Sequence, residues 1–458
     1  MKYFSTRNKN LNYSFKEVFL RGLAPDGGLF IPQQLKKYNS TELNELSRLN
    51  YAELATEIIY NFCAPDLEKS KLQGLVEKSY ESFNTKDVVA IKKIGDLNLL
   101  ELYHGPTLAF KDIAMQIIGN IYNEFNATDK KTINVIVATS GDTGSAAISA
   151  LKGKPNINVF VLHPHNKISH IQRKIMTTVE SKNIYNIALQ GNFDDCQKIV
   201  KDMFADNKFR ENINMSGVNS INWARIACQI VYYFYSSFKF QNKKINFSVP
   251  TGNFGDIYAG YVAKKMGLPI NKLIVATNRN DILQRVINTG VYKPSKVEPS
   301  LSPSMDIQIS SNFERLLFDI LEMSDSKVIS LMESLKSEGS FKLKKEELDI
   351  IKQDFYAEKT NDEETKKAIQ TIKKEHKFII DPHTATAVQA LKNIKDDSET
   401  VVLGTAHPYK FLETIKSATG EDVKPPAQFA NLLDKKEIYD ILENKTNLVK
   451  EYILKKAI

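Results

Sequence analysis

One lysine of the chain, Lys111, stands in a setting that suits covalent chemistry. It directly follows the apolar run 108–110, Leu-Ala-Phe. Burial beside apolar side chains lowers the pKa of an amine and supplies the neutral nucleophile that an aldehyde such as pyridoxal phosphate requires. A lysine followed by an acid, here Asp112, also forms ordinary solvated ion pairs. This segment therefore does not decide by itself between a covalent role and a surface ion pair.

A short apolar strand, a Gly-rich loop and a helix-forming run occur together twice. In the first copy the expected strand 133–138 leads into the loop 139–144, and in the second the expected strand 245–250 leads into the loop 251–256. Glycines let backbone N–H groups converge at a helix N-terminus, where anions bind. The other interpretation of each loop is a tight turn of an α/β protein with nothing bound.

Lys111 and the two loops together make a three-part set. The set offers an amine for an aldehyde, a cradle for a phosphate, and a second cradle for another anionic group. With further motifs in the same order, the chain resembles the threonine synthase family, which comprises pyridoxal-phosphate enzymes of the tryptophan-synthase-like fold type II. It is most similar to the longer subfamily of fungi and many bacteria, over nearly its whole length. The motifs that carry the resemblance are residues 104–112, 138–144, 167–169, 219–225, 249–256, 276–278, 381–383 and 404–408.

The resemblance implies a pyridoxal 5′-phosphate site. Lys111 is expected to form the Schiff base and to serve as the proton-transfer base. Thr405 is expected to meet the pyridine nitrogen, where a neutral hydroxyl does not enforce a charged ring as a carboxylate would. A hydroxyl that caps a turn is the other interpretation of Thr405. The cofactor phosphate is expected on backbone amides of Gly252, Asn253, Phe254 and Gly255.

The substrate that the resemblance implies is O-phospho-L-homoserine. Its α-carboxylate is expected on the first loop, through Ser140, Gly141 and Thr143. Asp142 lies between them, where many members of the fold type have asparagine. An acid beside a carboxylate is repulsive unless it points away or bonds the amide framework, so the loop's other residues are assigned to binding.

The substrate phosphate needs a second pocket. Lys167 is the first candidate, because it precedes a helix start that also offers Ser169, Gln172, Arg173 and Lys174. A basic solvated helix face is the other interpretation of that stretch. A further possible pocket is formed by Asn222 and Arg225, which lie in a segment whose other positions look like the core of a helix.

The implied reaction is a γ-elimination of phosphate followed by β-hydration, which gives L-threonine and phosphate. Two alternatives stay open: a phospho-lyase that releases 2-oxobutanoate, ammonia and phosphate, and a non-catalytic scaffold that binds pyridoxal phosphate. Three histidines lie inside the motifs, and each is expected more often to hold a loop than to catalyse. No cysteine or regular glutamate spacing typical of zinc ligands accompanies the histidines, so no metal is predicted.

Composition agrees with a large enzyme that acts on small anionic molecules. The formal net charge of +8 comes from lysines scattered over 458 residues, so no nucleic-acid partner is expected. The apolar run 226–238 is too short and too polar to span a bilayer and predicts a core helix, so no membrane partner is expected. Three widely spaced cysteines and the lack of a signal-peptide pattern at the start predict a cytoplasmic protein. Whether it is a monomer or a homodimer is left undecided.

The order of the predicted elements suggests an α/β fold with two lobes, whose parallel and mixed sheets are flanked by helices. Residues 1–95 are expected to form a mainly helical N-terminal domain, and 96–295 the two-lobed catalytic core. Residues 296–375, which are rich in lysine and glutamate and poor in strand signals, are expected to form a helical surface insertion. Residues 376–458 are expected to return to the core and end in C-terminal helices.

Overall fold

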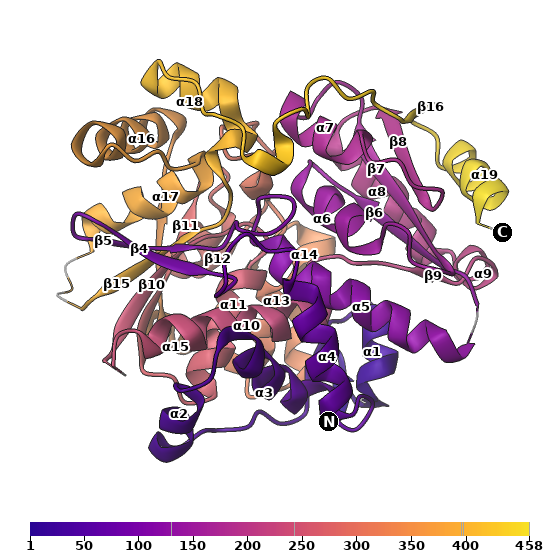
Figure 1. The fold of residues 1–458 in the computed structure, drawn as a ribbon. Helices are drawn as coiled ribbons and strands as arrows, with labels where there is room; N and C mark the ends of the chain where they lie inside the picture. Colours follow the sequence, from indigo (N-terminus) through magenta and orange to yellow (C-terminus); the bar gives the residue numbers. More distant parts are fainter. Residues whose placement is uncertain (130, 242, 395, 397, 458) are drawn as a thin grey trace.

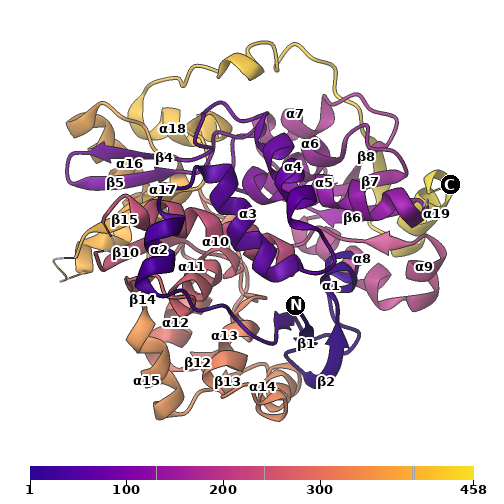
Figure 2. The ribbon, with the colours of Figure 1, turned by 60° about the horizontal axis from the view of Figure 1, so that its bottom comes forward.

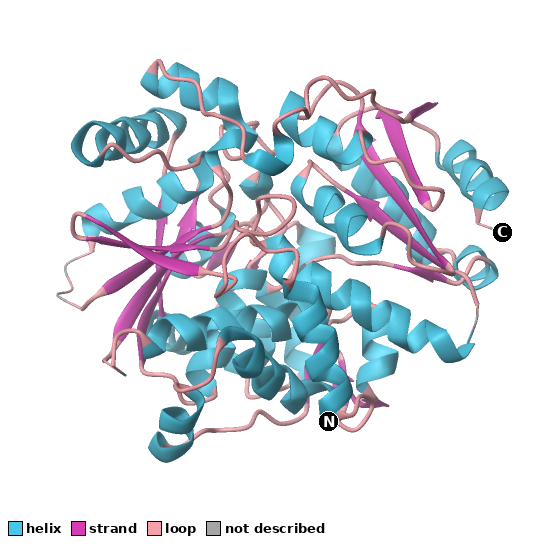
Figure 3. Cartoon of the chain, in the orientation of Figure 1, coloured by secondary structure: helices cyan, strands magenta, loops and turns pink. Residues whose placement is uncertain are grey.

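Two β-sheets form the frame of the molecule. The computed structural model describes residues 1–129, 131–241, 243–394, 396 and 398–457. In Figure 1 the larger sheet lies at the left and the smaller sheet at the right, with helices between them, and Figure 3 shows the same separation of the strands. The parallel and mixed sheets flanked by helices that the sequence predicts are therefore present.

The larger sheet has six strands in the order β14-β11-β10-β15-β5-β4, and only the β4–β5 pair is antiparallel. Central strands of a parallel sheet are buried on both faces, which explains their nearly continuous apolar sequences. Because β10, β15 and β5 are neighbours, the loops after their carboxyl ends meet at one edge of the sheet. The strands are β4 (Ala90–Ile94), β5 (Leu97–Glu101), β10 (Ile245–Pro250), β11 (Ile270–Thr277), β14 (Phe355–Lys359) and β15 (Thr400–Gly404).

The smaller sheet has five strands, all parallel, in the order β16-β8-β7-β6-β9. Its strand β6 leads into the first Gly-rich loop. After α18 (Leu412–Thr419) the chain crosses the molecule to add the edge strand β16, and Figure 2 shows this long crossing at the top. The strands are β6 (Ile133–Ala138), β7 (Ile157–Pro164), β8 (Ile184–Gln190), β9 (Met215–Ser216) and β16 (Asp440–Glu443).

Helix α10 (Trp223–Phe238) is the centre of the helical layer, and it is buried along nearly its whole length. It packs on α3, α5 and α11, which explains why its sequence is apolar on all sides. The helices of the core and of the smaller lobe are α5 (Lys111–Asp129), α6 (Asp142–Leu151), α7 (His170–Thr177), α8 (Phe193–Ala205), α9 (Asn207–Asn212), α11 (Gly255–Lys265), α12 (Ile282–Thr289), α17 (Pro382–Ala390) and α19 (Thr446–Lys456).

The N-terminal region is mainly helical but also holds a three-stranded sheet in the order β2-β1-β3. The buried aromatic residues of this region join the main hydrophobic core. Its elements are β1 (Tyr3–Ser5), β2 (Asn8–Tyr13), α1 (Phe15–Arg21), β3 (Phe30–Pro32), α2 (Ser40–Leu46), α3 (Tyr51–Cys63) and α4 (Lys69–Tyr80).

Residues 296–375 contain more strand than the sequence suggests. They are largely helical, but β14 joins the larger sheet as a parallel edge strand beside β11, and β13 pairs with β12. The segment is thus part of the core sheet and not only a surface insertion. Short strands with mixed polarity give little periodic signal, which is why the sequence did not reveal them. The elements here are β12 (Val291–Tyr292), α13 (Phe313–Ile320), α14 (Asp325–Glu338), β13 (Phe341–Lys342), α15 (Lys345–Asp354) and α16 (Asp362–His376).

Helices long and apolar enough to cross a bilayer are missing from the ranges that the structure describes.

Candidate active site

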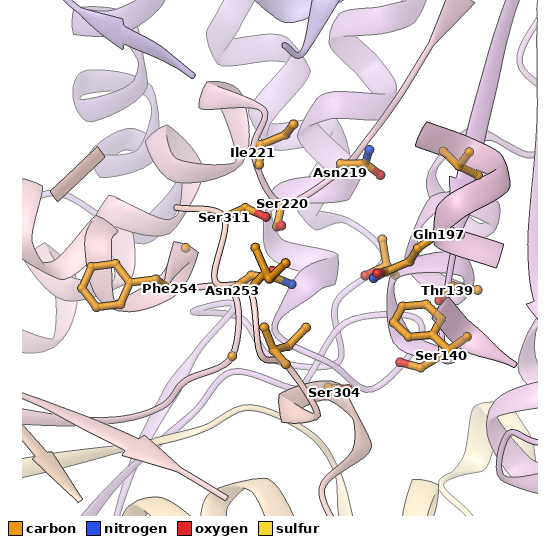
Figure 4. Close-up of a pocket in the computed structure, with 18 of the residues that line it drawn as sticks. Thr139, Ser140, Gln197, Asn219, Ser220, Ile221, Asn253, Phe254, Ser304 and Ser311 are labelled. Carbon is orange, nitrogen blue, oxygen red and sulfur yellow. The ribbon is translucent and has the colours of Figure 1, made fainter. Parts of the chain in front are cut away.

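A cavity of about 1130 Å³ lies between the two sheets, and residues of both Gly-rich loops line it. Figure 4 shows Asn253 and Ser304 on one side of this space and Thr139 and Ser140 on the other. The volume is at the large end of the range for small-molecule sites. Loops that follow strands of both sheets therefore converge on one space.

Lys111 is the first residue of α5, and its amine reaches this cavity. Only 9% of the residue is exposed. Its Nζ lies 3.0 Å from Oδ2 of Asp142. Burial lowers the pKa of the amine, and the Asp142 carboxylate acts in the opposite direction without cancelling that effect. The lowered pKa makes the neutral amine that nucleophilic attack requires easier to reach than in a solvated lysine.

Asp142 is a shared acceptor for two lysines. Besides Lys111, the buried Lys410 places its Nζ 2.6 Å from Oδ1 of Asp142. Gln172 Nε2 donates to Oδ1 at 2.9 Å, and Ser304 Oγ donates to Oδ2 at 3.2 Å. Burial opposes ionisation of this carboxyl, but the two lysines outweigh burial and hold its pKa well below the usual value. Asp142 thus faces the lysines rather than a substrate anion.

The loop 251–256 offers free backbone donors at the start of α11. The N–H groups of residues 252–255 donate to no acceptor within the described part of the chain. Phe254 has φ of 62°, a left-handed conformation that is costly for a bulky residue. Its ring is fixed between Phe313 and Phe355, with ring centroids 5.4 and 5.5 Å away. Unpaired N–H groups at a helix N-terminus fit a phosphate.

Thr405 follows β15 and reaches the same cavity. It is buried, yet its hydroxyl has no hydrogen bond to any residue that the structure describes. The carbonyl of Thr405 accepts the N–H of Phe110 at 2.9 Å, and Ala109 forms a β-bridge with Ala406. These contacts fix Thr405 beside the start of α5, so the hydroxyl remains available to a ligand.

The loop after β6 places Ser140 and Thr143 in the cavity wall. Gly141 is buried beside them and does not line the cavity. Its φ of 138° lies in the left-handed half of the map, and a Cβ would come within 2.8 Å of the Gln172 side chain. The predicted carboxylate loop is therefore closely packed, and only glycine fits at its centre.

Arg225 belongs to a buried polar group with unmet hydrogen bonds. Its Nε, the Oε1 of Gln229 and the Oδ2 of Asp256 have no partner among the described residues, and all three residues line the cavity. Burial lowers the pKa of Arg225 to about 10 and raises that of Asp256 to about 6. Buried polar atoms without partners mark a place where a ligand completes the hydrogen bonds.

Other residues of the two predicted phosphate pockets lie elsewhere. Lys167 is exposed and is not in the cavity wall. Asn222 is buried and caps α10, since its Oδ1 accepts the N–H of Ala224 and its Nδ2 donates to the carbonyl of Phe19. Arg173 pairs with Glu437 at 2.8 Å, and Lys174 donates to backbone carbonyls. The side chains of Arg173 and Lys174 already have partners because the crossing segment before β16, which is remote in sequence, packs on α7.

Sequence reasoning did not identify Lys410, which lies behind the cavity wall, or Ser304, which lies in it. Lys410, like Lys111, directly follows an aromatic residue, but its contact with Asp142 joins distant segments. His383, one of the three motif histidines expected to hold a loop, lines the cavity; its Nδ1 lies 3.0 Å from Oδ1 of Asp381, and its Nε2 accepts the N–H of Ser304. No sequence signal pointed to Ser304, which lies in the short 3-10 helix Pro303–Met305.

Comparison with known proteins agrees with this geometry. Residues 94–334 match the family model "Pyridoxal-phosphate dependent enzyme". Residues 2–80 match "Threonine synthase N terminus", and residues 384–453 match "Threonine synthase, C-terminal". A threonine synthase of Pseudomonas aeruginosa is 41% identical over 99% of this chain and 98% of its own length. A threonine synthase of Saccharomyces cerevisiae is 43% identical over 91% and 88%.

Solved structures are similar over the whole fold. The crystal structure of pyridoxal-phosphate-bound threonine synthase from Brucella melitensis has a TM-score of 0.96 and 40% identity, covering 100% of this chain and 99% of its own. The yeast threonine synthase structure has a TM-score of 0.92 and 40% identity, with 99% and 98% covered. The predicted fold type II is thereby confirmed.

Proposed function

The chain belongs to the threonine synthase family, and we propose that its cavity converts O-phospho-L-homoserine and water to L-threonine and phosphate. It is a pyridoxal-phosphate-dependent lyase. The observation that carries the proposal for this cavity is the buried amine of Lys111, which shares one wall with the loop 251–256 and Thr405.

The residues around Lys111 fit pyridoxal phosphate. The free N–H groups of residues 252–255 suit its phosphate, the unbonded hydroxyl of Thr405 suits its ring nitrogen, and the Lys111 amine suits its aldehyde. When bound, pyridoxal phosphate supplies an electron sink that stabilises negative charge on the substrate carbons.

The protein's own groups bind the substrate and move its protons. Lys111 Nζ takes a proton from the α-carbon and returns protons later, because a buried amine of lowered pKa is suited to both tasks. Ser140 and Thr143 are assigned to the α-carboxylate through their N–H and hydroxyl groups, and Gly141, whose N–H already donates to Thr139 Oγ1 at 2.9 Å, shapes the loop between them. The reaction needs one water molecule at the β-carbon, so closure around the substrate is expected to admit that water while limiting the hydrolysis that would release 2-oxobutanoate and ammonia.

Arg225 is the best-placed group for the substrate phosphate. It lines the cavity, as Asn219 and Ser220 do; its Nη1 donates to the carbonyl of Val218 at 3.4 Å, and its Nε has no partner among the described residues. Figure 4 shows Asn219 and Ser220 from one stretch of chain facing the open space. A guanidinium with a free donor suits a dianion. Asn222 acts indirectly in this proposal, since it caps the helix that carries Arg225.

The first test is to mix the cofactor-loaded protein with O-phospho-L-homoserine and to identify the organic product together with phosphate. Threonine supports the proposal. A product of 2-oxobutanoate with ammonia assigns the chain to the phospho-lyase activity, and phosphate release that fails altogether points to a scaffold. Lys111→Ala is the matched control, because it removes the amine and is expected to abolish both turnover and the absorbance band of bound cofactor.

Lys167 needs a separate experiment, because it is exposed and lies outside the cavity wall. The proposal keeps it as a phosphate ligand that reaches the substrate when the lobes close. Lys167→Ala is then expected to raise KM for O-phospho-L-homoserine with the cofactor spectrum unchanged. An unaltered KM removes Lys167 from the site, and a matched variant at the exposed Lys182, Lys182→Ala, controls for the loss of one surface charge.

We place the reaction in the cytoplasm. All three cysteines are free and buried, which suits a reducing compartment. The partner in this proposal is the small phosphorylated substrate, without nucleic acid or membrane. Fractionation of cells followed by an activity assay tests the location, and activity confined to a membrane or secreted fraction contradicts it.

A further inference from the structure

Lys410 is a second buried lysine at the Asp142 carboxylate, and the family reaction as proposed above gives it no task. It lies after β15 in the turn Pro408–Phe411, and none of it is exposed. Its Nζ lies 2.6 Å from Oδ1 of Asp142 and donates to the carbonyl of Thr107 at 2.9 Å. Burying a charged amine costs much free energy, and the pairing with Asp142 offsets only part of that cost. A buried pair of this kind is therefore expected to have a role in the site.

The two lysines use different oxygens of Asp142. Oδ1 accepts Lys410 and Gln172, while Oδ2 accepts Lys111 and Ser304. Lys111 and Asp142 line the cavity, but Lys410 does not. A ligand that draws Lys111 away therefore leaves the Lys410 contact intact, and Asp142 keeps a counter-ion at every stage.

We propose that Lys410 is a positioning residue for Lys111. Lys410 is the permanent counter-ion of the Asp142 carboxylate, so that Lys111 can present a neutral amine. The proposal rests on the proposed function only for the task of Lys111. It also explains why Asp142 is tolerated in a loop that is assigned to bind the α-carboxylate of the substrate. With Lys410 beside it, the charge of Asp142 is balanced without any contribution from Lys111 or from the substrate.

The directions in which Asp142 and Lys410 shift the pKa of Lys111 support this role. The Asp142 carboxylate raises the pKa of Lys111, whereas the Lys410 ammonium lowers it. Without Lys410, Lys111 alone would neutralise Asp142 and would hold its proton more tightly. The ionisable groups that act on the lysine–aspartate cluster from the surrounding elements are Asp112, Arg225, Asp256, His383 and His407.

The test measures the Lys111 amine directly in the full chain freed of cofactor. The chain is acetylated with acetic anhydride over a range of pH, and mass spectrometry quantifies modified Lys111. At a pH near 8, Lys410→Met is expected to label about tenfold more slowly than wild type, which corresponds to a pKa about one unit higher. Asp142→Asn is expected to label faster. The double variant Asp142→Asn/Lys410→Met is expected to return to within about threefold of wild type, because one charge of each sign is removed.

A labelling rate close to wild type in the double variant would show that charge balance, and not packing, controls the Lys111 amine. If Lys410→Met labels like wild type, or if the double variant stays as slow as Lys410→Met, the proposal is wrong. Should Lys410→Met fail to fold, the comparison of Asp142→Asn with the double variant replaces it, and equal labelling of those two overturns the proposal. A lysine–aspartate pair outside the cavity, Lys265 and Asp319 at 2.7 Å, gives the control Lys265→Met, which should leave Lys111 labelling unchanged. Labelling requires no turnover, so this result is separate from the product assay.

Discussion

The backbone N–H of Phe110 donates to the carbonyl oxygen of Thr405 at 2.9 Å. This bond fixes the residue before Lys111 to a residue at the end of β15, far along the chain. The bridge between Ala109 and Ala406 adds a second link at the same place. Because both links use the backbone, the Thr405 side chain can be replaced without separating the two segments.

Thr405→Val is therefore expected to keep the fold and to bind pyridoxal phosphate while losing the hydroxyl. The loss of one hydrogen bond to the ring nitrogen is expected to lower kcat about tenfold, or roughly 1.4 kcal/mol. Steady-state kinetics and the absorbance spectrum of the bound cofactor check this outcome. Thr405→Ser retains the hydroxyl and should stay close to wild type, whereas equal kcat values for Thr405→Val and wild type would show that the hydroxyl does not act on the bound cofactor.

Arg225→Met is expected to weaken substrate binding without lowering the stability of the fold. The guanidinium is buried and its Nε has no partner among the described residues, so an apolar replacement should leave thermal stability unchanged or higher. The substrate phosphate loses a charged donor, and KM is expected to rise about 30-fold, or ~2 kcal/mol. Kinetics together with thermal unfolding check both parts.

The comparison variant for Arg225 is Arg173→Met, whose guanidinium already pairs with Glu437 outside the cavity. It should leave KM within about twofold of wild type. If KM rises as much in Arg173→Met as in Arg225→Met, the substrate phosphate is assigned to the residues of α7 instead.

Asp256→Asn is expected to change how stability depends on pH. Burial raises the pKa of Asp256 to about 6, although Tyr233 donates to its Oδ1 at 2.9 Å. A carboxyl with a raised pKa in the folded state contributes stability at pH below its unfolded value near 4, and loses that contribution as pH rises through about 6. The variant should therefore match wild type near pH 4 and exceed it by roughly 3 kcal/mol near pH 7. Urea unfolding at both pH values checks this, and a constant difference between the two proteins would contradict it.

Local sequence patterns were enough to predict the frame and part of the site. The loops 139–144 and 251–256 follow buried parallel strands, so their place at the sheet edges could be inferred from strand–loop–helix order alone. Lys111 was identifiable from its apolar neighbours. The cavity places these elements together, although the assigned binding roles remain predictions.

Long-range pairing explains what the sequence did not reveal. Arg173 and Lys174 looked like anion ligands, but the crossing segment that reaches them lies more than two hundred residues later and supplies Glu437 and backbone carbonyls. Asp142 and Lys410 come from loops of different sheets, and no periodicity links them. Partners fixed by tertiary packing leave no trace in local spacing, so a lone basic residue remained ambiguous until the fold was known.

The glycines of the loop 251–256 offer a matched pair of variants. A Cβ on Gly252 would lie 3.0 Å from the carbonyl oxygen of Ser304 and 3.2 Å from Cα of Met305. A Cβ on Gly255 would meet its nearest atom, the side-chain Nδ2 of Asn312, at 3.3 Å. A backbone carbonyl yields less readily than a side-chain amide, and the Ser304 segment also holds Asp142 and His383 through hydrogen bonds.

Gly252→Ala is therefore expected to displace the Ser304 segment, to weaken pyridoxal phosphate binding at least about tenfold and to destabilise the fold by about 1–3 kcal/mol. Gly255→Ala lies in the first turn of α11, where alanine is favoured over glycine, and should change the affinity by less than about threefold. Absorbance titration with pyridoxal phosphate and thermal unfolding measure both effects. If Gly255→Ala weakens binding as much as Gly252→Ala, then the close approach of Ser304 to the loop is not what shapes the phosphate cradle.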